Sequence, residues 1–424
     1  MSPSSVKGLA EDCREGQGRV DEEKAFGARL REVRSWRGLT LREAAGFAGL
    51  SFSFWGQVER GEKAVNSRRT LEAMAAVLRV HPTELSGQPW MTPRDAVSSE
   101  AHAGLLTIET ALERYGLGTD PELLVRAWPQ IQADLDRLVE LQYNADYTAQ
   151  GELAPALIGE LHGAYARLPQ RHREVLIGLM MAYGSAMFTS KRLGGRGLPA
   201  LAARAVRQCA EALGEVVWLG YATYLRGHAT GHLDRAGQYR RSVAAAETLT
   251  GELDCGDALQ ACGMLHLSAA LAAGAQGDRA TVATHLEEAS ALAARMDTEV
   301  GDWGQMSFGR INVGIWRTSL AVELGEYGQA IEAAKTVHPE LLPVPVVRQA
   351  MFWVEFGRAL VAERKTWEEG LRVLLRAERL APQRVRNDLF VREAVANLLR
   401  QARRDAGGRE LRGLAWRMGV APTR

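Results

Sequence analysis

The sequence has few cysteines, and their positions exclude two common kinds of site. Only four occur in 424 residues, Cys13, Cys209, Cys255 and Cys262, without Cys-X-X-Cys or Cys/His spacing. This scatter argues against a zinc site and against a disulfide framework, and it fits a reducing compartment. We therefore expect a cytoplasmic protein without a structural metal.

Long apolar runs are absent as well. The longest, near Leu176–Phe188, is shorter than the ~20 residues that span a bilayer and contains Gly178 and Gly184, so we interpret it as a buried helix. Residues 1–20 have no apolar core of the kind found in signal peptides, and we expect a disordered arm there. No membrane partner is predicted.

Strand-like patterns are rare in this chain. Leucine and alanine instead recur every three or four residues through most of it, which predicts an all-α fold. A chain of 424 residues exceeds one ordinary core, so we expect two or three domains. Residues 88–100 contain two prolines and several small polar residues, and they predict a linker between an N-terminal domain at 21–87 and a helical body at 101–424.

A catalytic or cofactor-binding arrangement is also lacking. His228 and His232 have i, i+4 spacing without the accompanying carboxylates of a metal site, so we expect an exposed pair on a helix. Gly194 and Gly195 lie in KRLGGRGLP, a string typical of an inter-helix loop rather than of a phosphate loop. We therefore predict no enzyme activity, no cofactor and no bound metal.

The net charge is only +1, but it is unevenly distributed. Residues 24–87 carry eleven Lys and Arg and six acidic residues, a balance of +5, so the remaining residues sum to −4. A small basic domain on a mildly acidic body indicates a polyanionic partner for the N-terminal domain alone.

The body shows internal repetition. Four segments each contain an apolar helix, a turn and a second helix, and the turns fall near Gly231, Gly277, Gly325 and Lys365. Small residues stand five positions after each turn (Ala236, Val282, Ala330, Gly370) and twelve positions after it (Val243, Ala289, Val337, Ala377). Such residues let antiparallel helices approach closely, and the pattern resembles tetratricopeptide repeats. An irregular helical bundle is the alternative.

The string LREAAGFAGLSFSFWGQVER, which begins at position 41, has the spacing of two helices that cross in contact. Ala45 is small where the helices would touch, and Gly49 permits the left-handed backbone of a tight turn. Trp55 and Val58, three residues apart, fall on the inner face of the second helix. Ser51 is placed to cap that helix.

Residues 24–87 resemble the phage Cro/repressor (xenobiotic-response-element, XRE) family of helix-turn-helix domains. The resemblance is carried by LREVRSWRGLTLREAAGFAGLS, QVERGEKAVNSRRTLEAMAAVLRV and HPTEL. It implies a five-helix domain whose third helix, residues 51–60, enters the major groove of double-stranded DNA. It also implies that Arg34 and Glu59 form an internal ion pair.

The resemblance further assigns Phe52, Ser53 and Gln57 to positions that read bases. Gln57 is suited to bidentate pairing with adenine, and Phe52, where a polar residue is usual, to contact with a thymine methyl. Gly56 in mid-helix is a second departure. The candidates for phosphate contact are Thr40, Lys63, Ser67, Arg68 and Arg69.

The string FGRINVGIWRTSLAVELGEYGQAIEAA, residues 308–334, is similar to the helical repeat regions of XRE-type regulators from high-GC bacteria. A broader likeness is to peptide-pheromone receptors, in which a concave helical surface binds a peptide through asparagine side chains. On this basis Asn312, Arg310, Trp316, Trp303, Gln305, Arg348 and Trp353 are predicted to contact an effector. The alternative is that these tryptophans belong to the core and that the polar groups are solvated.

These features together predict a bacterial transcriptional regulator. It is expected to bind a near-palindromic operator as a homodimer, because one reading helix covers only a few base pairs, and to respond to a peptide or small-molecule effector. One alternative is a protein–protein interaction scaffold in which the helix-turn-helix is secondary. An enzyme is a third alternative, for which no residue set stands out.

Overall fold

The computed structural model describes residues 26–85, 96–342, 346–402 and 408–420. Every regular element in those ranges is a helix, as the leucine and alanine periodicity predicts, and no strand occurs in them. The predicted arm at 1–20 lies outside the described residues. Of the predicted linker, only the part from Ala96 is described, and it already belongs to the first helix of the body.

The N-terminal domain contains five helices, in agreement with the prediction. They are α1 (Phe26–Trp36), α2 (Leu41–Phe47), α3 (Phe52–Glu59), α4 (Arg68–Leu78) and α5 (Pro82–Leu85). Leu30, Trp55, Met74 and Leu78 are fully buried between them. Phe390, from the far end of the chain, is buried in the same cluster, so the body completes the core of this domain.

Side-chain caps fix where the helices of this domain begin. The Thr40 hydroxyl accepts a hydrogen bond from the Glu43 N–H, while the Glu43 carboxylate accepts one from the Thr40 N–H, which makes a capping box at α2. The Ser51 hydroxyl accepts from the Phe54 N–H at 3.1 Å and caps α3, as predicted. Gly49 has a φ of 64°, the left-handed conformation that its position in the turn requires.

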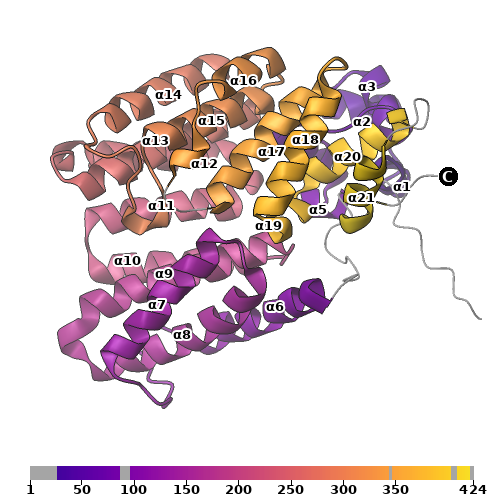
Figure 1. Ribbon diagram of the computed structural model, residues 1–424. Helices are drawn as coiled ribbons and strands as arrows, with labels where there is room; N and C mark the ends of the chain where they lie inside the picture. Colours follow the sequence, from indigo (N-terminus) through magenta and orange to yellow (C-terminus); the bar gives the residue numbers. More distant parts are fainter. Residues whose placement is uncertain (1–25, 86–95, 343–345, 403–407, 421–424) are drawn as a thin grey trace, which may run out of the picture.

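The body is built from helices that follow one another in two layers, and Figure 1 shows α6–α10 below α11–α16. The lower layer contains α6 (Ala96–Arg114), α7 (Trp128–Tyr143), α8 (Tyr147–Arg167), α9 (His172–Arg192) and α10 (Leu198–Leu213). The upper layer contains α11 (Val216–Thr230), α12 (Arg235–Thr248), α13 (Gly256–Gln276), α14 (Arg279–Ala294), α15 (Arg310–Glu323) and α16 (Tyr327–Ala334). The chain ends beside the N-terminal domain with α17 (Val346–Ala362), α18 (Trp367–Leu380), α19 (Pro382–Arg386), α20 (Leu389–Ala402) and α21 (Arg409–Arg417).

The four predicted turns all join consecutive helices that pack on each other, from α11–α12 to α17–α18. In the later pairs the small residues at the expected offsets are buried, except for Val337, which is half-buried. A Cβ added at Gly370 would lie 2.8 Å from the Val361 backbone nitrogen, so only glycine fits there. In the first pair the offset differs, because Ala236 is exposed and Gly237 is buried in its place. The bend at η3 (Gly231–Leu233) lengthens that turn and shifts the buried position.

One helix, α13, is the apolar centre of the body. It is the only helix within the described residues that is long and apolar enough to cross a membrane, and 94% of its apolar stretch is buried inside the protein. A Cβ at Gly263 would lie 2.0 Å from the ring of Phe308, so this glycine lets the aromatic side chain pack directly against the backbone of the helix. Both features are those of a central core helix.

Candidate nucleic-acid interface

The outer face of α3 is open to solvent. Phe52 is 55% exposed, Ser53 is exposed and Gln57 is half-buried, whereas Trp55 and Val58 are buried on the inner face. Helix α3 lies at the outer edge of the molecule, away from the lower layer of the body (Figure 1). The three residues predicted to read bases therefore share one accessible face.

The unusual Gly56 lies on the inner side of α3, near α2. It is buried on α3, and a Cβ at this position would lie 3.1 Å from the Arg60 guanidinium and 3.6 Å from a methyl of Leu41. The distance to Leu41 is an ordinary van der Waals contact, and the flexible Arg60 side chain can move, so the space would admit an alanine. Glycine weakens the intrinsic preference of α3 for helix by roughly 1 kcal/mol relative to alanine.

A buried ion pair holds α3 to α1. The Arg34 guanidinium donates to both carboxylate oxygens of Glu59, at 2.5 and 2.9 Å, and to the Leu39 carbonyl at 2.8 Å. The same carboxylate accepts a hydrogen bond from the Trp55 indole N–H at 2.7 Å. Hydrogen bonding to Glu59 raises the pKa of Arg34. The predicted pair is therefore present, and it ties the inner face of α3 to the first helix.

This geometry can be compared with known families. Residues 25–86 match the family of helix-turn-helix domains. No curated protein and no solved structure matches this chain. The helix-turn-helix domain suggests DNA binding and transcriptional regulation, while the match ends before the body and leaves the role of the body to its own structure.

Two of the phosphate candidates lie on the solvent side of the helix-turn-helix domain. Thr40 is exposed at the start of α2, and Lys63 is exposed after α3 with its ammonium 5.0 Å from the ring centre of Phe54. Arg42 lies over the ring of Phe52 at 5.8 Å. Cations therefore flank the reading face on both helices of the motif, as DNA phosphates would require.

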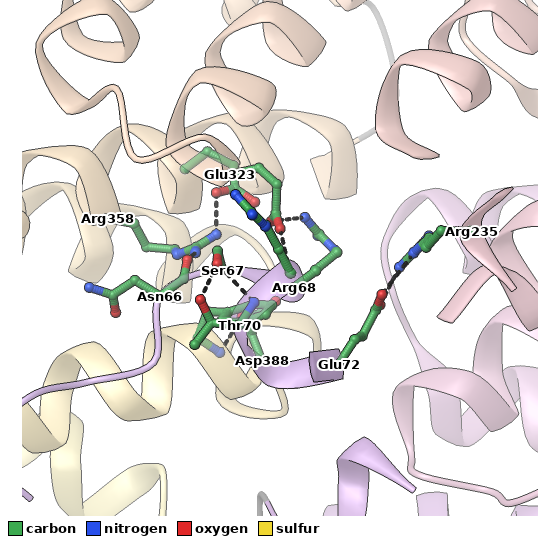
Figure 2. A network of polar contacts seen from close by, with 12 residues as sticks. Asn66, Ser67, Arg68, Thr70, Glu72, Arg235, Glu323, Arg358 and Asp388 are labelled. Carbon is green, nitrogen blue, oxygen red and sulfur yellow. Dashed lines mark hydrogen bonds and ion pairs between the residues drawn. The ribbon is translucent and has the colours of Figure 1, made fainter. Parts of the chain in front are cut away.

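The other three phosphate candidates face the body instead. Ser67 caps α4, and the carboxylate of Glu323, at the end of α15, accepts hydrogen bonds from the Arg68 guanidinium at 2.9 Å and from the Arg69 N–H at 3.1 Å (Figure 2). The Glu323 side chain is fully buried. The Glu323 carboxylate thus binds the N-terminus of α4 and the Arg68 guanidinium, the two groups that would otherwise be suited to bind a phosphate.

Further polar contacts extend this interface with the body. Arg235 donates to both carboxylate oxygens of Glu72 on α4, at 2.5 and 3.0 Å, and both side chains are mostly buried. The buried Arg358 donates to the Asn66 carbonyl at 2.6 Å and lies over the ring of Phe390 (Figure 2). The helix-turn-helix domain is therefore docked on the body through α4, and α3 points away.

A pair of histidines closes one edge of this interface. His232 does not lie on an exposed helix face, as its spacing from His228 had suggested, but packs against α5. Its Nε2 is 2.9 Å from the Nε2 of His81, with one ring donating and the other accepting. His228 is packed against Tyr224 in the body. The contact between the domains covers His232, whereas His228 is covered by aromatic side chains of the body itself, and the local periodicity shows neither contact.

Acid is expected to weaken this docking. Burial lowers the pKa of His81, and it lowers the pKa of His232 to about 4; Arg196 and Glu84 also face His81, and Lys191 and Arg235 face His232. Because both pKa values are depressed in the docked state, the contact is fully stabilising above about pH 6.5 and is lost as pH falls toward about 4.

Small-angle X-ray scattering of the full chain should therefore give a larger radius of gyration at about pH 5 than at about pH 7.5. The His232→Gln variant should show less of this difference, because its side chain does not titrate. A radius that is equally pH-dependent in the variant would contradict the assignment to the histidine contact.

The seven residues predicted to bind an effector do not share one surface. Asn312 is fully buried, and its amide donates to the Met306 carbonyl at 3.3 Å, so it is not available to grip a peptide backbone. Trp316 is buried in the main core. Arg310 lies on the outside of the body, where it pairs with Glu299 at 2.9 Å. These three residues therefore make contacts within the body and do not form a shared binding surface.

The remaining four are divided among three places. Trp303 packs against aromatic rings of α11, and Trp353 is partly buried between two apolar clusters. Gln305 and Arg348, by contrast, line one cavity inside the body. Within the described residues no cluster of three or more potential metal ligands occurs. The sequence predicted two residues of this cavity, Gln305 and Arg348, but not the cavity itself.

Proposed function

We propose that this protein is a cytoplasmic, non-enzymatic transcriptional regulator of the bacterial XRE type that recognises a specific operator in double-stranded DNA through α3. The observation that supports this most strongly is the open outer face of α3, with Phe52, Ser53 and Gln57 in line above a rigidly held inner face. The balance of +5 within residues 24–87 would supply the sequence-independent attraction to phosphates.

We further propose that the protein binds its operator as a homodimer and that the body, a solenoid of tetratricopeptide-like helix pairs, binds an effector. A single α3 reads only a few base pairs, so two half-sites about one DNA turn apart are needed for specificity. The helix pairs α11–α12 to α17–α18 support the solenoid proposal.

Base reading can be separated from phosphate contact by two substitutions. After selection of an operator from random DNA, Gln57→Ala is expected to weaken binding to that operator roughly 5- to 150-fold, and to leave binding to unrelated DNA unchanged. Lys63→Ala should weaken both equally and lower the slope of log affinity against log salt by about 1. Fluorescence anisotropy over a range of salt concentrations measures both effects. Recovery of no preferred sequence from the selection would defeat the proposal.

The docked arrangement bears on regulation as well. The Arg68 guanidinium and the Arg69 N–H cannot bind a phosphate while they bind Glu323. Any DNA complex that uses these groups requires α4 to separate from Glu323, while Phe390 stays in the core of the helix-turn-helix domain. We therefore propose that the docked state has the lower affinity for DNA and that undocking raises it.

A different form of the scaffold alternative, in which the helix-turn-helix domain itself binds another protein, is favoured by one observation. Three large aromatic side chains of the helix-turn-helix domain, Trp36, Phe47 and Phe52, are 77%, 71% and 55% exposed. Exposed aromatic residues are enriched where proteins bind one another. If the protein is a scaffold, Gln57→Ala should leave its cellular phenotype unchanged, whereas Trp36→Ala should abolish it.

A further inference from the structure

A cavity lies inside the body where its two layers meet. Its walls come from α7, α8, α9 and α11, from the loop at η5 (Trp303–Gln305), and from α17 and α19. Its volume is about 90 Å³. Because a single water needs only about 10–15 Å³ on this measure, the cavity holds a small molecule of several heavy atoms rather than a folded peptide.

Three guanidinium groups line this cavity. Arg192 comes from the end of α9, Arg348 from the first turn of α17 and Arg384 from α19. Of these three arginines, only Arg384 has an ion-pair partner among the described residues, which is Asp388 at 2.6 Å. The Nε of Arg384 is buried and has no hydrogen-bond partner. Three positive charges are thus paired with a single carboxylate.

Such an arrangement is unfavourable when the cavity is empty. Burial, and then the nearby charge of Arg384, lower the pKa of Arg192 to about 10. Buried cations in proteins are usually paired, since removal from water is costly unless an anion compensates it. An unpaired Arg192 beside Arg348 and an unsatisfied Arg384 Nε therefore mark a place that an anion would stabilise.

The rest of the wall restricts the kind of anion. Tyr143, Tyr147, Tyr221 and Tyr224 surround the cavity, and their hydroxyls add neutral donors to those of the arginines. Phe188, together with leucine, valine and methionine side chains, supplies the apolar part of the wall, and three glutamines and Ser307 add further polar groups. Arginine forks bind carboxylate and phosphate groups bidentately, whereas aromatic faces bind flat apolar groups.

We propose that this cavity is the effector site, and that its ligand is a small organic anion whose carboxylate or phosphate group binds Arg192, Arg348 and Arg384 and whose apolar part packs among the tyrosines. The inference rests on the proposed function, since it names the chemical class of the effector that the body was proposed to bind.

The site is connected to the helix-turn-helix domain by a short stretch of chain. Asp388, the partner of Arg384, also accepts hydrogen bonds from the N–H groups of Phe390 and Val391, at 3.0 and 3.3 Å, and so fixes the start of α20. Phe390 is buried in the core of the helix-turn-helix domain and lies under Arg68. An anion that competes with Asp388 for Arg384 acts directly on this support.

The test uses the full chain and four defined probes: inorganic phosphate, phenyl phosphate, phenylacetate and the neutral benzyl alcohol. Isothermal titration calorimetry should detect binding of phenyl phosphate or phenylacetate, and the one that binds identifies the anionic group. Arg192→Gln and Arg348→Gln should each weaken that binding roughly 10- to 100-fold. The control Arg204→Gln, at an exposed position of α10, should leave it unchanged.

A second readout separates a ligand-binding arginine from a structural one. Without ligand, Arg192→Gln should not lower the melting temperature, because it removes a half-buried cation that has no ion-pair partner among the described residues. A structural arginine would lower it. Equal binding of benzyl alcohol, equal binding of inorganic phosphate alone, or undiminished binding in both cavity variants would each overturn the assignment. So would the absence of binding by all four probes at millimolar concentration.

Operator binding is measured in parallel on the same proteins. Loss of anion binding in a chain that still selects an operator would defeat this inference and leave the proposed regulator intact. Anion binding in a chain that selects no operator would do the reverse. With both present, saturating anion is expected to change the operator affinity of the native chain and not that of Arg192→Gln.

Discussion

Replacing Glu59 with alanine is expected to destabilise the helix-turn-helix domain by roughly 3–5 kcal/mol. The substitution removes the carboxylate that Arg34 binds within the described residues, and it removes the acceptor of the Trp55 indole N–H. The Arg34 side chain is 13% exposed. A buried cation and a buried donor are then left uncompensated, and the reading helix loses its tie to α1. Urea unfolding of the full chain, followed by hydrogen exchange of the α3 amides, measures this loss.

The matched control for that experiment is Glu62→Ala. Glu62 pairs with Arg60, but both side chains are more than half exposed, so solvent screening leaves their interaction with little effect on stability. Glu59→Gln should fall between the two, because its amide oxygen still accepts from Trp55. Equal destabilisation by Glu59→Ala and Glu62→Ala would show that the ion pair does not hold α3.

Replacing Glu323 with glutamine is expected to release the helix-turn-helix domain and to raise affinity for the selected operator about tenfold or more. The Glu323 carboxylate is buried and binds Arg68 and the Arg69 N–H. The neutral amide keeps the shape but removes the charge that balances Arg68 and the positive end of α4. The undocked domain can then offer both groups to phosphates. Anisotropy measures the affinity, and hydrogen exchange of the α4 amides measures the undocking.

Two further variants make this test specific. Glu326→Gln, three residues away, removes a pair with Arg279 inside the body and should leave operator affinity unchanged. Adding Arg68→Ala to Glu323→Gln should cancel most of the gain, because the released cation is then missing. If Glu323→Gln undocks the domain and affinity does not rise, the docked state is not the weak one.

Local patterns were sufficient for the helix-turn-helix domain. The spacing of Ala45, Gly49, Trp55 and Val58 depends on two helices that cross within twenty residues, and the Arg34–Glu59 pair joins neighbouring elements. The helical turns of the body were likewise predicted, since each depends on consecutive helices. Periodicity reports which side of a helix is apolar, and these features need little more than that.

The surface by which α4 docks on the body could not be predicted from local sequence patterns. Arg68 and Glu323 are 255 positions apart in the chain, and many other arginines and glutamates offered an equivalent pairing. The basic start of α4 therefore suited DNA as well as it suited the body. The histidine contact was missed for the same reason, because His81 and His232 are 151 positions apart.

The sequence predicted two residues of the cavity, Gln305 and Arg348, but it predicted them as part of a concave peptide-binding surface and not of a cavity. Gln305 and Arg348 were chosen as neighbours of Asn312 on a concave surface, whereas Asn312 itself is buried under Met306. The cavity instead combines segments from α7 to α19, and only the three-dimensional packing shows that Arg192 and Arg384 meet there. An excess of buried positive charge is invisible in a sequence whose charges balance.

The presence of Phe390 in the core of the N-terminal domain limits how freely this reader can be exchanged between proteins. A chimera that carries residues 25–86 on an unrelated body would leave a hole where this ring is buried, beside the exposed edge of α4. Such grafts should express poorly unless an aromatic side chain is supplied at an equivalent place. Evolutionary shuffling of this module would meet the same constraint, so reader and body are expected to be inherited together.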